Sequence, residues 1–379
     1  GGLLNGCRAP SARRGSVMEA DTERLVVALP PDDDDRASSH ASGVLGQSSQ
    51  PPFVLKQAPS LHDAASLLHD GHVDLLVASA QMWGEMEQNG LTIAACLQRR
   101  EPTWVMVSDD KPEMLHHEAK VGCDHPLLER QLTRLRPDLV LIDPRTMNDA
   151  WDDMSGVERT AWYEQTRQRG TLEGYVIPRS LHRSLPGRPP RRHTLGLHRD
   201  DPTRPRFVPP PLGGLTLLIS RSGFPNEQLK PMSDAGALLA HRIERAMLAA
   251  VPAVLRPITG IHVERRRPAT LLMEAAKVED EHTLESMLDP EASLKTKGHR
   301  VEIIIETLGA GGRGSASSER VFPVEHTHTG MVRALEEWSE VLQAMTSEHA
   351  ALVKGAHFMG EFEASFSEAH GAMMRLEDG

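Results

Sequence analysis

The sequence predicts an α/β protein of two or three domains, and three observations support this fold class. The chain has 379 residues, too many for one ordinary core, since single domains usually hold ~100–150 residues. Hydrophobic residues make up 39% and charged residues 25%, which is typical of a globular protein. Apolar runs of strand length alternate with helical patterns, as they do in α/β domains.

The first half supplies most of this alternation. LVVAL at 25–29 follows a flexible arm and predicts a buried strand. The polar stretch from Asp32 to Pro52 predicts a mobile loop, with the run Asp32–Asp35 solvated. Ser60 is a candidate N-cap for a helix over 60–69. The other predicted elements are strands at 53–55, 73–78, 91–97, 104–107 and 139–142 and a helix at 127–135.

The second half begins with a stretch that breaks the alternation. Residues 179–211 are rich in Pro, Arg and His, and proline removes backbone donors, so we expect a long irregular connection. The elements predicted after it are a helix at 234–251 and strands at 215–219, 258–263, 271–275 and 301–306. Two apolar stripes at helical spacing follow. They are Val332, Leu335, Trp338, Leu342 and Met345, and then Phe358, Phe362, Phe366 and Met373.

Charge and cysteine content limit the function classes. The formal net charge of −11 argues against extensive binding to nucleic-acid phosphates. Apolar runs are too short for a membrane span. Three cysteines without CxxC spacing favour a reducing compartment. The first segment carries Arg8, Arg13 and Arg14 and no acid before Glu19, which favours an organellar location, mitochondrion over plastid. A cytoplasmic location is the alternative.

Several segments, in order, resemble hydroxymethylbilane synthase (porphobilinogen deaminase). LLHDGHVDLLVASAQMWGEMEQNGLTIAACLQRREP resembles the family's LL-x-G-x-I-D-x-A-V-H-S-x-K-D-V-P and G-L-x-I-A-A-x-L-x-R-E-D-P. VGCDHPLLERQLTRLRPDL resembles VGTSSLRRxAQLxxxRPDL at the same length. LIDPRTMND, PPLGGLTLLIS and HRIERAMLAAV resemble three further family segments. The match runs over residues 67–265 and weakly to 345.

The resemblance implies three domains. Two are α/β units like those of periplasmic binding proteins, with the active cleft between them, and the third is a small α/β domain whose cysteine tethers a dipyrromethane cofactor. We therefore expect an arm and polar loop over 1–52, domain 1 over 53–110 with 24–30 and part of 207–235, domain 2 over 111–206 with the loop 179–211, domain 3 over 236–330 and C-terminal helices over 331–379.

The residues that the family's chemistry needs are missing at the matched positions. The family's catalytic acid falls on Met82, and a thioether neither holds a negative charge nor exchanges a proton. Its carboxylate-binding arginines fall on Leu127, Leu128 and Trp151, although Arg145 is retained. The tethering cysteine falls on Leu255. We therefore predict a pseudoenzyme without catalytic residues or cofactor. No metal site is predicted either, because the histidines lack ligand spacing.

Two features are candidate partner sites. The arginine-rich loop could contact an RNA or an acidic protein surface; its candidates are Arg183, Arg188, Arg191 and Arg192. The second C-terminal stripe could dock on a partner or pack on the protein's own third domain; its candidates are Phe358, Phe362 and Phe366.

Three hypotheses of function follow. The first is an inactive scaffold that serves as a structural or accessory subunit of a larger assembly, which an organelle could house. The second is an active synthase of tetrapyrrole biosynthesis with a relocated site and a covalent dipyrromethane. The third is a small-molecule sensor that uses the interdomain cleft. With Met82, Leu127, Leu128 and Trp151 lining it, that cleft would favour an apolar ligand.

Overall fold

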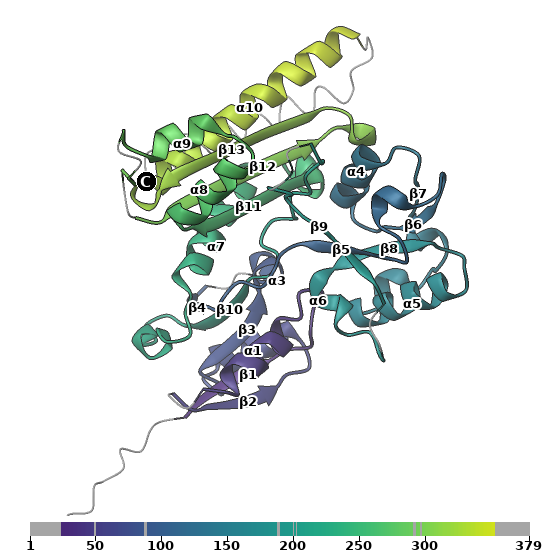
Figure 1. The fold of residues 1–379 in the computed structure, drawn as a ribbon. Coiled ribbons are helices and arrows are strands. Elements are labelled where there is room, and N and C mark those ends of the chain that lie inside the picture. The colour runs from purple at the N-terminus through teal and green to yellow at the C-terminus, as the bar shows by residue number, and fades with distance from the viewer. Residues whose placement is uncertain are drawn as a thin grey trace, which may run out of the picture.

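The computed structural model describes residues 24–352, apart from 49–50, 87–88, 188–189, 200, 202, 291–292 and 296–297. These residues form two α/β lobes and a third domain. Figure 1 shows the first lobe mainly in purple to blue, with a later strand, β10, in teal to green, the second lobe in blue to teal and the third domain in green to yellow. None of the helices in this part of the chain has the length and apolar content that a bilayer crossing requires.

Lobe 1 is a five-stranded mixed sheet in the order β2-β1-β3-β10-β4. Its strands are β1 (Leu25–Leu29), β2 (Phe53–Gln57), β3 (Leu75–Ser79), β4 (Leu91–Cys96) and β10 (Thr216–Arg221). Its helices are α1 (Ala37–Leu45), α2 (Leu61–His69) and α3 (Ala80–Met86). Strands β1, β2 and β3 are parallel, whereas β10 runs antiparallel to both of its neighbours. Apolar clusters cover both faces of the sheet, as expected for strands that lie between helix layers.

The prediction of a mobile loop over 32–52 is wrong, because α1 lies within it. The Asp32 carboxylate accepts a hydrogen bond from the Ser39 amide (2.8 Å), and the Asp33 carboxylate accepts one from the Ala37 amide (3.3 Å). Acids at this end satisfy free amides and suit the positive end of the helix dipole. At α2 the predicted cap is confirmed, since the Ser60 hydroxyl accepts from the Asp63 amide.

Lobe 2 repeats the topology of lobe 1, with the strand order β7-β6-β8-β5-β9. Its strands are β5 (Trp104–Ser108), β6 (Lys120–Gly122), β7 (Val140–Ile142), β8 (Gly174–Pro178) and β9 (Arg192–Leu195). Its helices are α4 (Pro126–Leu135), α5 (Gly156–Gln168) and the single turn α6 (Arg179–His182). Again one strand, β5, is antiparallel to both neighbours. Because β5 pairs in this sheet, residues 104–108 belong to lobe 2 rather than to the expected domain 53–110.

Two segments cross between the lobes. Residues 97–103 lead from β4 to β5, and residues 196–215 lead from β9 back to β10. The stretch 179–211 is therefore only partly irregular, since α6 and β9 interrupt it.

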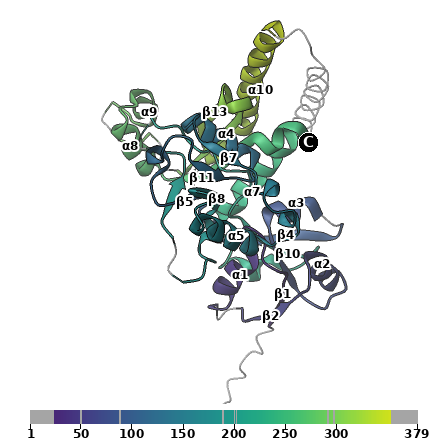
Figure 2. The same ribbon diagram turned by 90° about the vertical axis from the view of Figure 1, so that its right-hand side faces the viewer.

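The third domain is a three-stranded antiparallel sheet with helices on both faces (Figure 2). Its elements are α7 (Ala235–Ala250), β11 (Thr259–Arg266), α8 (Pro268–Lys277), α9 (Glu281–Met287), β12 (Arg300–Leu308), β13 (Ser315–Pro323) and α10 (Thr327–Leu352). Odd-numbered residues of β12, such as Ile303 and Ile305, pack on α7 and α10. The predicted stripe on α10 is confirmed, since Leu335, Trp338 and Leu342 are buried in the same core.

The strand predicted at 271–275 is wrong, because these residues lie in helix α8. Pro268 is accepted in the first turn of a helix, where no backbone donor is needed. Leu271 and Ala275, four residues apart, then lie on one buried face.

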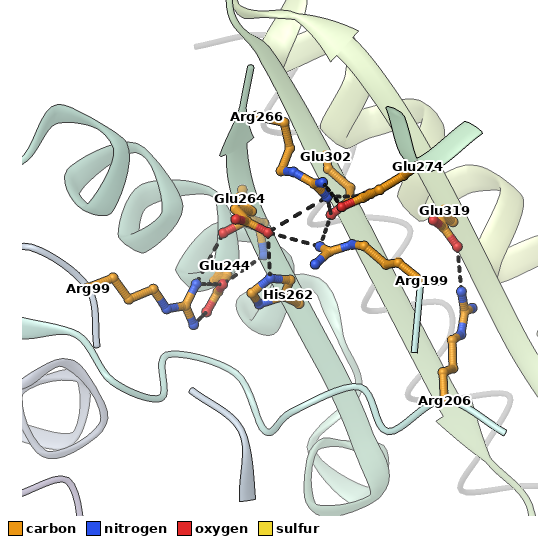
Figure 3. Close-up of polar contacts among 11 residues, drawn as sticks. Arg99, Arg199, Arg206, Glu244, His262, Glu264, Arg266, Glu274, Glu302 and Glu319 are labelled. Atoms are coloured by element: carbon orange, nitrogen blue, oxygen red, sulfur yellow. Dashed lines mark hydrogen bonds and ion pairs between the residues drawn. The ribbon is translucent and has the colours of Figure 1, made fainter. Parts of the chain in front are cut away.

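Arginine–glutamate pairs fix the third domain to the lobes. Glu244 on α7 is fully buried and accepts from Arg99 Nη1 (2.6 Å) and Nη2 (3.2 Å). Its carboxylate also accepts from the amides of Leu212 (2.6 Å) and Val263 (2.9 Å). Arg99 lies in the first crossing segment and Leu212 in the second, so this one carboxylate holds both of them. Figure 3 shows the Arg99–Glu244 pair beside a second group of ion pairs on the sheet.

Candidate ligand site between the lobes

Two neighbouring cavities lie where the carboxyl ends of the parallel strands of the two lobes face each other. The first, here called the basic cavity, has a volume of about 620 Å³ and lies between α1, the first crossing segment and α6. The second, here called the inner cavity, has a volume of about 240 Å³. Asp35, Glu101, Arg179 and Ser180 line both cavities. Ligands of open α/β sheets bind at this edge of the strands.

The basic cavity holds three arginines without ion-pair partners. Arg100, Arg179 and Arg183 line it, and none has a carboxylate within 4.0 Å among the residues that the structure describes. The Nε and Nη2 atoms of Arg100 are buried without a hydrogen-bond partner, and burial lowers the pKa of this guanidinium. Arg36, on the same wall, is instead paired with Asp32. Because an unpaired charge away from water is costly, the cavity favours an anionic occupant.

Asp35 is the less exposed of the two acids that line this cavity, the other being Glu101. The Gly214 amide, from the second crossing segment, donates to Asp35 Oδ2 (3.0 Å). Burial, with repulsion from Asp33, raises the pKa of Asp35 to about 7, although Arg100 opposes the shift. His40 on α1 contacts the Thr216 hydroxyl through Nδ1 (2.9 Å), and burial lowers its pKa to about 4. At neutral pH the cavity therefore contains a neutral imidazole and a carboxyl group that is about half protonated.

Contacts between the lobes lie beside the inner cavity. Arg159 on α5 lies 3.2 Å from Asp34 Oδ1 of lobe 1 and 3.7 Å from Asp124 Oδ2 of lobe 2. The Ser180 hydroxyl donates to the Asp34 carbonyl (2.7 Å). Asp34 lies so close to the start of α5 that a Cβ on Gly156 would overlap its carboxylate. Burial raises the pKa of Asp34 and of Asp124, with Arg159 opposing in both cases.

The expected apolar lining of the cleft is wrong. Leu127 and Leu128 on α4 lie in the lobe 2 core, and Trp151 is buried against Tyr163, with Arg159 over its ring at 5.9 Å. The rotation of α4 decides this, since its apolar residues face the sheet and not the cleft. Met82 on α3 is 40% exposed.

The other predicted site residues fall into different places. Arg145 lines the inner cavity but is paired with Asp143 (3.3 Å) and Asp152 (2.9 Å). Leu255 is buried in the core of the third domain. Residues Arg188, Phe358, Phe362 and Phe366 lie outside the described residues.

The predicted loop arginines do not share one surface. Arg183 lines the basic cavity. Arg191 donates to the Asp109 carbonyl (3.1 Å), and Arg192 donates to His182 Nδ1 (3.0 Å). Two of the three candidate arginines that the structure describes, Arg191 and Arg192, are therefore engaged within lobe 2.

A third group of charged residues lies on the sheet of the third domain (Figure 3). His262, Glu264 and Glu302 have ligand atoms within 4.8 Å of one another, as a metal site requires. Arg199 Nη2, however, pairs with Glu302 and with Glu264 (2.9 Å), and Arg266 pairs with Glu302 (3.1 Å). The guanidinium groups supply the positive charge that these carboxylates need, so the cluster is an ion-pair network that holds the second crossing segment.

Neither described cysteine suits a cofactor tether. Cys96 and Cys123 are buried, burial raises the pKa of both thiols, to about 12 for Cys96, and neither lines the two cavities. A thiol of high pKa away from the cavity is a poor nucleophile for a ligand bound there.

The sequence motifs do not point to Asp34, Asp35, Arg100, Arg159 or Arg179 as site residues. A positional signal was present for some of them. Asp34 and Asp35 follow the buried strand β1, and Arg179 directly follows β8, so each lies at the carboxyl end of a parallel strand.

Comparisons with known proteins do not show a family. No family model and no curated protein matches the chain. Among solved structures, YhfZ from Shigella flexneri is 20% identical over 59% of this chain and 95% of that chain, with a TM-score of 0.27. The ligand-binding component of an ABC-type import system from Staphylococcus aureus is 13% identical over 59% of this chain and 73% of that chain, with a TM-score of 0.29. The OxyR regulatory domain from Pseudomonas aeruginosa is 12% identical over 58% and 97%, with a TM-score of 0.28.

These TM-scores are too low to carry an argument, so the chain is described by its own topology. It is a mixed α/β protein with two lobes of the same strand order and a third domain that holds both crossing segments.

Proposed function

We propose that this chain is a catalytically inactive, two-lobed binding protein that holds a small anionic molecule between its lobes. The observation that carries the proposal is the basic cavity with its three unpaired arginines, Arg100, Arg179 and Arg183. Guanidinium groups bind carboxylate and phosphate in a bidentate manner. The ligand class therefore differs from the apolar one expected for a sensor of this kind.

Descent from hydroxymethylbilane synthase is part of the proposal. A helix that leads into the first strand of a small antiparallel domain, as α7 leads into β11, agrees with the order of the matched segments. The residue at the family's acid position is Met82, and the described thiols lie away from the cavities. An active synthase with a relocated site has less support for these reasons.

The accessory-subunit hypothesis also has less support than ligand binding. Arg191 and Arg192, two of its candidate contacts, are engaged within the protein. An organellar location and a protein partner stay predictions.

The test is thermal unfolding with succinate, phosphate and sulfate, each compared with chloride at matched ionic strength. At least one anion is expected to raise Tm, because a ligand at 100 times its Kd stabilises by ~2.7 kcal/mol. The double variant Arg179→Gln/Arg183→Gln should lose this response, whereas Arg191→Gln, outside the cavity, should keep it. If no anion raised Tm, or if the double variant responded like the wild type, the proposal would be wrong.

Porphobilinogen turnover, with intact mass on the same sample, tests the synthase alternative. An unmodified mass and no uroporphyrin on oxidation are expected. A dipyrromethane adduct with turnover would establish the enzyme instead.

A further inference from the structure

Two acids, Asp35 and Glu101, line the basic cavity among its cations, and Asp35 is the less exposed of the two and is placed to contact the occupant. Asp35 faces both cavities, and its Oδ2 atom accepts a hydrogen bond from the Gly214 amide. No other hydrogen bond to this carboxyl group is found among the described residues, so Oδ1 remains for a ligand. Arg100 attracts the carboxyl group, but no ion pair joins the two within 4.0 Å.

A fully ionised anion held by these arginines would face a carboxylate at Asp35. The two groups repel each other when neither carries a proton, and they form a charge-assisted hydrogen bond when one proton lies between them. An anion that brings its own proton, such as hydrogen phosphate, can donate to Asp35 at any pH at which Asp35 is ionised. Sulfate has the same shape but no proton above acidic pH, so it needs Asp35 itself to be protonated.

We infer that Asp35 makes the basic cavity selective for anions that carry a proton, of the hydrogen phosphate or phosphomonoester kind, over anions that cannot donate, such as sulfate. This inference rests on the proposed function, since it concerns the same cavity.

The groups around Asp35 allow its effect to be isolated between pH 6 and pH 8. On α1 and the turn before it lie Asp33, Arg36 and His40, and burial lowers the pKa of this imidazole to about 4, so it stays neutral. Arg99, Arg100 and Glu101 come from the first crossing segment, and Arg179 and Arg183 from α6. Arginine does not titrate in this range. Asp34 and Asp124, whose pKa values burial also raises, lie on the inner cavity with Arg159.

The experiment is calorimetric titration of the full chain with inorganic phosphate and with sulfate, at pH 6 and pH 8 and matched ionic strength. At pH 8 phosphate should bind about 10- to 100-fold more tightly than sulfate, the range that a hydrogen bond to a charged group gives. Sulfate affinity should fall about tenfold from pH 6 to pH 8, because its binding then requires proton uptake by Asp35. Phosphate affinity should change much less.

Asp35→Asn is the deciding variant, because an amide can donate to sulfate without titrating. It should bind sulfate and phosphate with similar affinity at both pH values. Asp110→Asn, on the surface of lobe 2 outside both cavities, should keep the wild-type selectivity. Urea unfolding of each variant without ligand checks that it is folded.

The outcomes separate the two proposals. Equal binding of sulfate and phosphate to the wild type at pH 8 would overturn the selectivity of Asp35 and leave anion binding in place. Selectivity that survives in Asp35→Asn would overturn it as well. Absence of binding by both anions would overturn the proposed function and this inference together.

Discussion

Glu244→Gln is expected to destabilise the protein more than the change of any surface acid. The wild-type carboxylate accepts four hydrogen bonds, from two nitrogens of Arg99 and from the amides of Leu212 and Val263. Glutamine keeps one acceptor oxygen and places an NH₂ group against donors, and Arg99 loses its counter-charge while its side chain is only 12% exposed. Breaking a buried ion pair in this way costs about 3–5 kcal/mol. The remaining amide oxygen reduces this to about 2–4 kcal/mol.

The assay is urea unfolding followed by circular dichroism, with Glu337→Gln as the matched control. Glu337 pairs with Arg320 on the surface of the third domain, where both side chains are more than a third exposed, 37% and 51%. Such a pair contributes about 0–1 kcal/mol, so the control should shift the midpoint little. A loss below 1 kcal/mol for Glu244→Gln would refute the view that this carboxylate holds the crossing segments.

Three further predictions concern the cleft and its surroundings. Asp35 has its pKa raised to about 7 by burial, so the folded chain binds more protons than the unfolded chain above about pH 4, and stability should fall as pH rises toward 8. In urea unfolding at pH 5 and pH 8, Asp35→Asn should reduce this fall and leave the part that Asp34 and Asp124 cause, because burial raises the pKa of those groups too. The variant should be more stable than the wild type at pH 8 by about 1–3 kcal/mol, a value discounted for partial exposure. Equal pH slopes for the variant and the wild type would contradict this prediction. Gly156→Ala should displace Asp34 from the start of α5, because the added Cβ would overlap its carboxylate, and the separated lobes should increase the radius of gyration in small-angle scattering. Gly43→Ala is the control, since a Cβ there meets nothing within 4 Å, and it should leave the radius of gyration unchanged. Leu127→Arg places an arginine at a family position, but Leu127 is fully buried. The variant should therefore lose more than ~3 kcal/mol of the free energy of unfolding, measured by thermal unfolding, and should not gain an anion site. A folded variant that has gained anion binding would contradict this prediction.

The elements with strong local signals could be predicted from the sequence. The buried strands β1, β3 and β5 are short apolar runs, and α2 has a serine cap and helical spacing. Helix α1 could not be predicted from the sequence, because its small polar residues are typical of loops. Only the structure shows that the Asp32 and Asp33 carboxylates accept hydrogen bonds from amides in the first turn of this helix.

The site could be predicted less well than the fold, because its residues are distant in sequence. Arg100 and Arg179 reach one cavity only after two crossing segments and two sheets have formed. The matched motifs placed Leu127 at an arginine position, but alignment fixes a position along a helix and not the side of the helix that faces the cleft.

The positions of the strands of each lobe along the chain have a consequence for how the protein folds during synthesis. All five strands of lobe 2 lie within residues 104–195, whereas lobe 1 lacks β10 until residues 216–221 have been made. Lobe 2 can thus complete its sheet first, while β3 and β4 of lobe 1 wait for the strand that lies between them. Two unpaired apolar edges stay open over more than a hundred residues of translation, so aggregation of nascent chains should start in lobe 1.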